Sequence, residues 1–155
     1  MEAEPHNLGD TKRRVLIIDA NDLVARAISR ILELAGCLVR SVQDTGSAVG
    51  VALAFQPHVL IVDVGTRRYD VPTLLNALRA HPQLQDCDFI GTTSSASEHP
   101  APQPALRRVL SKPFTVAELY EAVLGENALV TTTAYSGRTV RADDAGSARR
   151  TGRFD

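Results

Sequence analysis

Residues 59–63 read Val-Leu-Ile-Val-Asp, four apolar residues followed by one carboxylate. A short, continuous apolar run is typical of a β-strand that is buried on both faces, as strands of a parallel sheet are. Residues 15–19 read Val-Leu-Ile-Ile-Asp and have the same character. The two stretches therefore predict two buried parallel strands, each of which leads directly to an aspartate.

Helical segments and further short apolar runs alternate along the chain around these two stretches. Apolar residues recur at helical spacing between residues 24 and 35, after the candidate N-cap residues Asn21 and Asp22. The other elements that we expect are strands at 38–42, 89–92 and 109–110, and helices at 47–55, at 72–80 and from 115 to near 125. This alternation predicts an α/β fold, a doubly wound five-stranded parallel sheet.

One interval departs from the alternation. A helix is expected between the last two strands, but the segment there contains Pro100, Pro102 and Pro104. Proline lacks the backbone N–H that a helix needs and its ring clashes with the preceding turn, so three alternate prolines exclude a regular helix. We therefore expect the fourth helix to be missing, or shortened to about residues 105–107.

The chain is expected to form one domain with two extensions. Residues 13–125 carry the periodic pattern. Residues 1–12 read as a flexible lead without the apolar stretch of a signal peptide. Residues 126–155 have no periodicity and are predicted to be a disordered tail. No apolar run approaches the length of a membrane span, so we expect a cytoplasmic protein.

The composition narrows the class of protein further. Apolar residues make up 44% of the 155 residues and tryptophan is absent, which predicts an aliphatic core. A net charge of −1 gives no general argument for binding nucleic acid or a membrane surface. Cys37 and Cys87 lack metal-ligand spacing, so we expect both to be reduced and buried.

Four polar residues are predicted to lie at one edge of the sheet. Asp19, Asp63 and Thr93 follow the first, third and fourth strands, and Lys112 follows the fifth. Ligands of open α/β sheets bind beyond the carboxyl ends of the strands, where the strand order reverses. Two carboxylates can hold a divalent cation, and an ammonium group can neutralise a phosphoryl group. Packing alone is a poor explanation for all four residues in these positions.

The sequence resembles the receiver domains of two-component response regulators over roughly residues 13–125. The motifs that carry the resemblance are residues 15–19, residues 57–63 (Pro-His-Val-Leu-Ile-Val-Asp), Thr93-Ser94 and residues 110–114 (Leu-Ser-Lys-Pro-Phe). The resemblance implies a flavodoxin-like, CheY-like receiver fold. It also implies a signalling domain whose only chemistry is its own phosphorylation and dephosphorylation, and not an ordinary enzyme.

The resemblance assigns roles to these residues by position. Asp63 would be the phosphoacceptor, supplied by a histidine kinase or a phosphotransfer protein. Thr93 would hydrogen-bond the phosphoryl oxygens and Lys112 would pair with their charge. The Lys112–Pro113 peptide bond would be cis, which is energetically accessible before proline.

The magnesium site implied by the resemblance is damaged. Asp19, Asp63 and the backbone carbonyl of Gly65 would hold the ion. Receiver domains usually have two acidic residues after the first strand, and the second of them contacts the metal directly. Here Ala20 occupies that second position and has no ligand atom. Because magnesium requires near-ideal octahedral oxygen geometry, we expect it to bind weakly or not at all.

The loop after Asp63 contains two arginines, Arg67 and Arg68. One interpretation is a solvated loop that carries two cations. The other places Arg67 or Arg68 over the crevice, where a guanidinium could partly replace the metal or hold an anion through two hydrogen bonds.

Val109 stands where many receiver domains have an aromatic residue that turns inward on activation. Valine cannot act as an aromatic switch, and we interpret it as ordinary core packing.

The predicted tail contains five arginines, which offer a partner hypothesis. They are Arg138, Arg141, Arg149, Arg150 and Arg153. The simplest interpretation is a soluble disordered tail. The alternative is an arm that folds onto an anionic partner such as a second-messenger nucleotide or nucleic acid.

Two functions from different classes remain open. The first is a phosphorylatable signalling module without a DNA-binding output domain, which would dock on a downstream protein. The second is a pseudo-receiver, a binding module that works without phosphate and that could take a cyclic di-nucleotide through its arginines. The presence of Asp63, Thr93 and Lys112 favours the first, and Ala20 favours the second. A hydrolase is disfavoured because no histidine stands with a nucleophile at a strand end.

Overall fold

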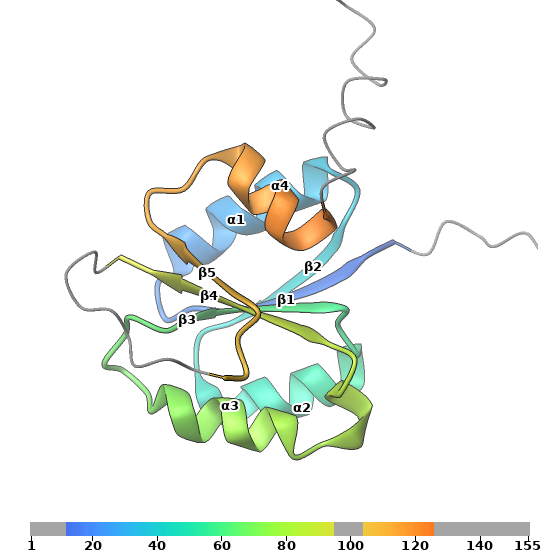
Figure 1. Ribbon diagram of the computed structural model, residues 1–155, viewed down its shortest axis with the longest axis vertical. Coiled ribbons are helices and arrows are strands. Elements are labelled where there is room, and N and C mark those ends of the chain that lie inside the picture. The colour runs from blue at the N-terminus through green and yellow to red at the C-terminus, as the bar shows by residue number, and fades with distance from the viewer. Residues whose placement is uncertain (1–11, 95–103, 126–155) are drawn as a thin grey trace, which may run out of the picture.

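The computed structural model describes residues 12–94 and 104–125 of the chain (Figure 1). Its elements in chain order are β1 (Arg14–Ile18), α1 (Asp22–Leu34), β2 (Leu38–Val42), α2 (Thr45–Phe55), β3 (Val59–Asp63), α3 (Val71–Arg79), the short 3-10 helix η1 (Pro82–Leu84), β4 (Asp88–Thr93), β5 (Arg108–Ser111) and α4 (Val116–Leu124). The order and type of the predicted elements are confirmed. Their bounds differ by at most two residues, and those of β2 agree.

The five strands form one parallel sheet in the order β2-β1-β3-β4-β5. Helices α1 and α4 cover one face of the sheet, and α2 and α3 cover the other (Figure 1). This confirms the predicted fold class, a doubly wound five-stranded parallel sheet. The strand order reverses between β1 and β3, so the chain leaves these two strands toward opposite faces and a crevice opens beyond their carboxyl ends.

The core is divided by the sheet into two layers. On β1, Val15 and Ile17 pack with the α1 and α4 side, whereas Leu16 and Ile18 pack with the α2 and α3 side. All four are fully buried. Side chains of a strand alternate between faces, so a strand with a helix layer on each side must be apolar at every position. Burying each such side chain contributes about 1.5–3 kcal/mol.

Side-chain caps determine where the helices begin. The Asn21 side chain accepts hydrogen bonds from the backbone N–H groups of Leu23 and Val24, so Asn21 is the N-cap of α1. A capping box begins α4, because Thr115 and Glu118 each bond the other's backbone N–H. Such caps satisfy N–H groups that a helix leaves without partners in its first turn.

The described residues between β4 and β5 form no helix. Residues 104–107 form a turn and a bend, so, of the two expected alternatives, the shortened helix near 105–107 does not form. The reason is that the chain already joins the sheet there: the backbone N–H of Arg107 donates to the carbonyl of Phe89 at 2.8 Å. Residues 95–103 lie outside the described residues.

Val109 is not a core residue, so the interpretation as ordinary core packing is wrong. It is 42% exposed, whereas its neighbour Leu110 is 4% exposed and packs with α1 and α4. Because β5 is an edge strand and its side chains alternate, the inward position belongs to Leu110.

The predicted lead and tail fall almost wholly outside the described residues, which exclude 1–11 and 126–155. Within the described part of the chain, no helix has the length and apolar character needed to cross a membrane.

Three residues with reactive side chains have structural roles. Cys37 and Cys87 are both free and buried, as expected, and burial raises the pKa of the Cys87 thiol to about 12. His58 Nδ1 accepts a hydrogen bond from the backbone N–H of Arg14 at 2.9 Å, which joins the beginnings of β3 and β1. Burial, followed by the charges of the nearby arginines, lowers the pKa of His58.

Candidate functional site

The four polar residues predicted at the edge of the sheet do meet there. Asp19 follows β1, Asp63 and Thr93 are the last residues of β3 and β4, and Lys112 follows β5. The Lys112 ammonium lies 3.2 Å from Asp19 Oδ2 and 4.0 Å from Asp63 Oδ2. The backbone N–H of Lys112 donates to the carbonyl of Thr93 at 2.7 Å. The Lys112–Pro113 peptide bond is cis.

Asp19 is a buried carboxylate whose two oxygens both have partners. It is 2% exposed. Its Oδ1 accepts a hydrogen bond from the backbone N–H of Asn21 at 2.8 Å, and its Oδ2 accepts one from Lys112 Nζ. A buried carboxylate is strongly stabilised by such donors. The Asp19–Lys112 pair is therefore both part of the site and part of the folded structure.

Asp63 is more accessible than Asp19 and less completely bonded. Its side chain is 15% exposed, and Oδ1 accepts a hydrogen bond from the backbone N–H of Gly65 at 3.1 Å. Burial raises the pKa of the Asp63 carboxyl, the Lys112 charge opposes this shift, the Asp19 charge adds to it and the Gly65 N–H opposes it. Oδ2 faces Lys112.

Thr93 and Gly65 approach each other closely at the end of β4. Thr93 is 4% exposed, and a Cβ atom at Gly65 would lie 2.8 Å from its hydroxyl oxygen. Only glycine leaves room for the hydroxyl at this distance. The Thr93 hydroxyl thus lies beside the loop that carries Asp63.

Tyr69 is a site residue that the sequence analysis missed. Its hydroxyl donates to the backbone carbonyl of Asp63 at 2.8 Å and lies 3.3 Å from that of Ile18. Burial raises the pKa of this phenol, and the charges of Asp63 and then Asp19 raise it further. The phenol therefore joins the carboxyl ends of β3 and β1 as a neutral donor. Nothing in the sequence distinguished it from an ordinary loop residue.

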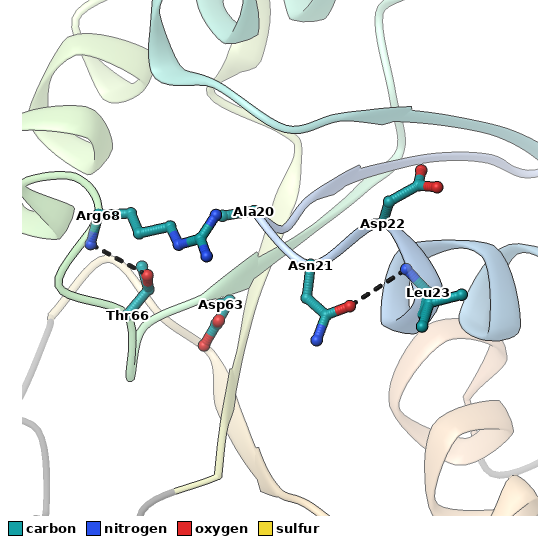
Figure 2. Close-up of a pocket in the computed structure, with 7 residues that line it drawn as sticks. All are labelled: Ala20, Asn21, Asp22, Leu23, Asp63, Thr66 and Arg68. Carbon is teal, nitrogen blue, oxygen red and sulfur yellow. Dashed lines mark hydrogen bonds between the residues drawn. The ribbon is translucent and has the colours of Figure 1, made fainter.

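A cleft of about 450 Å³ opens beside Asp63, between the start of α1 and the loop after β3 (Figure 2). The residues that line it are Ala20, Asn21, Asp22, Leu23, Asp63, Thr66 and Arg68. Figure 2 shows the Arg68 side chain extending toward Ala20. Of the two loop arginines, Arg68 is therefore the one that lines the cleft, and Arg67 is not among its lining residues.

The oxygen atoms on the Ala20 side of the cleft are already engaged. The Asn21 side chain caps α1. Asp22 accepts hydrogen bonds from Gln43 at 2.7 Å and pairs with Arg26 at 2.7 Å. Among the described residues, no cluster of three or more His, Cys, Asp or Glu side chains is arranged to hold a metal ion. Of the side chains expected to hold magnesium, Asp19 and Asp63 are both at the site, and Asp19 is bonded to the Asn21 N–H and to Lys112, whereas Ala20 offers no ligand atom.

Comparison with known proteins finds a matching family model and similar folds. The family model for the response regulator receiver domain matches residues 15–124. The transcriptional regulatory protein PrrA of Mycobacterium tuberculosis is 29% identical over 116 residues, which are 74% of this chain and 50% of PrrA. The chain thus spans about half the length of this relative.

Solved structures show the same fold. A response regulator of Burkholderia pseudomallei, solved with a phosphorylated aspartic acid, a calcium ion and citrate, is 25% identical. It has a TM-score of 0.64 over 81% of this chain and 74% of its own. The receiver domain of a sensor histidine kinase of Pseudomonas aeruginosa, with magnesium coordinated in its active-site cleft, is 23% identical. Its TM-score is 0.65 over 72% of this chain and 94% of its own.

Proposed function

This chain belongs to the family of response regulator receiver domains, and on that premise we propose that it accepts a phosphoryl group on Asp63 and signals by docking on other proteins. The observation that carries the proposal is the convergence of a partly exposed carboxylate, a buried hydroxyl and an ammonium group at one edge of the sheet. The Asp63 Oδ2–Lys112 Nζ distance of 4.0 Å is the centre of that arrangement.

The proposed reaction is transfer from a phosphohistidine or an acyl phosphate. Asp63 Oδ2 forms a bond to phosphorus while the bond between phosphorus and the donor nitrogen or oxygen breaks, and its electron pair leaves with the donor. The Gly65 N–H holds the other carboxylate oxygen and so orients Asp63 for attack. Lys112 neutralises charge on the phosphoryl oxygens, and the Thr93 hydroxyl donates to one of them. Catalysis of this kind is mainly positioning and electrostatic stabilisation.

The proposed cofactor is at most a weakly held magnesium ion. Bound magnesium would supply charge neutralisation at the phosphoryl oxygens. Ala20 removes one ligand, and Lys112 already engages one oxygen of Asp19.

The proposed partners are a histidine kinase or phosphotransfer protein and a downstream target. The surface that we propose for the target includes β5 and α4, where Val109 is 42% and Val116 is 47% exposed. An apolar side chain contributes most to the free energy of binding when it is exposed in the free protein and buried by the partner. Phosphorylation would reach this surface through Thr93, whose strand pairs with β5.

The second candidate function is a binding module that works without phosphorylation, and Ala20 is the observation that favours it. Its suggested ligand, a cyclic di-nucleotide, would need several arginines. The five tail arginines lie outside the described residues, and of the loop arginines only Arg68 lines the cleft.

The intact mass of the protein after incubation with acetyl phosphate tests the proposed function, with Asp63→Asn as the control. We expect a gain of one phosphoryl group that the Asn variant does not show. A second reaction with a phosphorylated phosphotransfer protein tests the natural class of donor. Absence of any gain from either donor, in protein shown to be folded, would contradict the proposal and leave the phosphate-independent binding module.

A further inference from the structure

We infer that Arg68 takes the place of the divalent cation, so that its guanidinium binds the phosphoryl group and Asp63 is phosphorylated without magnesium. This inference rests on the proposed function and adds the means of charge neutralisation. It follows from three features of the cleft: the space beside Ala20, the anchoring of the loop that carries Arg68, and the distribution of ion pairs.

The first feature is the space that alanine leaves. The 450 Å³ cleft has Ala20, Asp63 and Arg68 in its lining, and a neighbouring hollow of about 350 Å³ is also lined by Ala20 and Arg68. The Arg68 side chain extends toward Ala20 (Figure 2). The cation and the position that lacks a carboxylate thus occupy the same part of the site. A carboxylate at position 20 would attract this guanidinium to itself and away from an incoming anion.

The second feature is that the loop is fixed on both sides of Arg68. The backbone N–H of Arg68 donates to the Thr66 hydroxyl at 3.1 Å. The next residue, Tyr69, is bonded to the Asp63 carbonyl, and Asp70 then caps α3 through the Thr73 N–H at 3.1 Å. A backbone held in this way limits the region that the arginine side chain can reach. Preorganised charge stabilises a reacting group more effectively than charge on a free loop.

The third feature is that the acidic residues near Arg68 are already bonded to other groups. Asp44, which lines the neighbouring hollow with Arg68, caps α2 through the Ser47 N–H at 2.9 Å. Asp22 pairs with Arg26 at 2.7 Å, and Asp19 pairs with Lys112 at 3.2 Å. Within residues 12–94 and 104–125, the Arg68 guanidinium has no ion-pair partner. Its charge and its donors therefore remain available to a ligand.

The chemistry of the phosphorylated state needs a second cation. Lys112 faces two carboxylates, Asp19 and Asp63, so the buried part of the site already has one negative charge in excess. Phosphorylation replaces the Asp63 carboxylate with an acyl phosphate that carries more negative charge. A guanidinium offers two parallel N–H donors that match two phosphoryl oxygens, and it stays charged at any working pH. In the transfer from acetyl phosphate, the phosphorus–oxygen bond to acetate breaks, its electron pair leaves with acetate, and the bond to Asp63 forms.

The test compares the rate of phosphoryl incorporation from acetyl phosphate in EDTA and in millimolar magnesium, measured by intact mass. We expect the wild-type protein to react equally fast in both. Arg68→Gln should be slower by roughly 10- to 100-fold in both, the effect of losing one charge-assisted donor to a phosphoryl group. Arg68→Lys should lie between the two, because it keeps the charge and loses the paired donors. Arg30→Gln, which removes an exposed arginine of α1 outside the lining of the cleft, should react as the wild type does.

A second variant restores the carboxylate. Ala20→Asp/Arg68→Gln should gain magnesium binding in a calorimetric titration, and its phosphorylation should require the metal. Thermal unfolding of every variant shows whether each is folded.

The outcomes separate this inference from the proposed function. A wild-type protein that is phosphorylated in magnesium but not in EDTA would overturn the role of Arg68 and leave Asp63 as the acceptor. An Arg68→Gln rate equal to the wild-type rate would do the same. No phosphorylation from acetyl phosphate or from a phosphotransfer protein, in either medium, would overturn the proposed function and this inference with it.

Discussion

The two sides of the cleft differ in how far their residues are buried and bonded to one another. The acceptor side consists of Asp63, Thr93 and Lys112, which come from three strand ends and are buried or bonded to one another. The opposite side consists of Ala20 and Arg68 and has an open hollow between α1 and the loop after β3. On the acceptor side, the contacts that we propose for function also hold the fold together. On the Arg68 side the two are expected to be separate, so that its residues can change without loss of the fold.

Replacing Lys112 should have the largest effect on the free energy of unfolding, because it removes the ion pair on the acceptor side. Lys112→Met keeps the aliphatic stem but leaves the Asp19 carboxylate, 2% exposed, without its cation. Removing one partner of a buried ion pair costs about 3–5 kcal/mol, and the 19% exposure of the Lys112 side chain places this pair near the lower value. Urea unfolding measures the loss. The double variant Asp19→Asn/Lys112→Met should recover part of it, and a full loss in the double variant would contradict a pairwise role.

Tyr69→Phe should have an intermediate effect, because it releases the link between the ends of β1 and β3. The phenol donates to the Asp63 carbonyl at 2.8 Å, and removing a donor to a partly buried carbonyl costs about 1–2 kcal/mol. Thermal unfolding measures the change. Tyr120→Phe is the matched control, because its hydroxyl donates to the carbonyl of Ile31 at 3.0 Å, away from the cleft. Both losses should be similar, but only Tyr69→Phe should also slow phosphorylation of Asp63.

The effect of Asp63→Asn on the free energy of unfolding should depend on pH. The pKa of Asp63 is raised in the folded protein, chiefly by burial. The folded state therefore binds the proton more tightly than the unfolded state, and the wild type loses stability as pH rises through the raised pKa. Relative to the wild type, the Asn variant should be more stable at neutral pH, and the difference should vanish below the ordinary pKa of aspartate. Urea unfolding of both proteins at several pH values measures this. A constant difference across pH would contradict it.

Arg68→Gln should have the smallest effect on stability, a change within about 0.5 kcal/mol, which is usual for an exposed side chain that takes part in no ion pair of the described chain. Thermal unfolding should therefore show nearly the same midpoint as the wild type. A large destabilisation would show that the Arg68 side supports the fold and would remove the distinction between the two sides.

Local patterns were enough to predict most of the fold. The apolar run at residues 59–63 depends on neighbours in the chain and forms the expected strand, and Asn21, one of the two candidate caps, is the N-cap of α1. Long-range effects account for the features that local patterns left open or placed wrongly. The turn at 104–107 forms because Arg107 already bonds to β4, and Val109 is exposed because β5 lies at the sheet edge.

Hydrophobic periodicity and capping act over a few residues, so they were enough to predict the order of the elements and to place Asp19, Asp63, Thr93 and Lys112 at strand ends. Which of these groups meet depends on contacts between distant parts of the chain. Asp19 and Lys112 are 93 residues apart in the chain and form one ion pair. Tyr69 and Arg68 are neighbours in one loop, yet the first bonds to two strand ends and the second lines the cleft. These choices depend on how packed strands and helices orient a loop in space, and no short stretch of sequence contains that information.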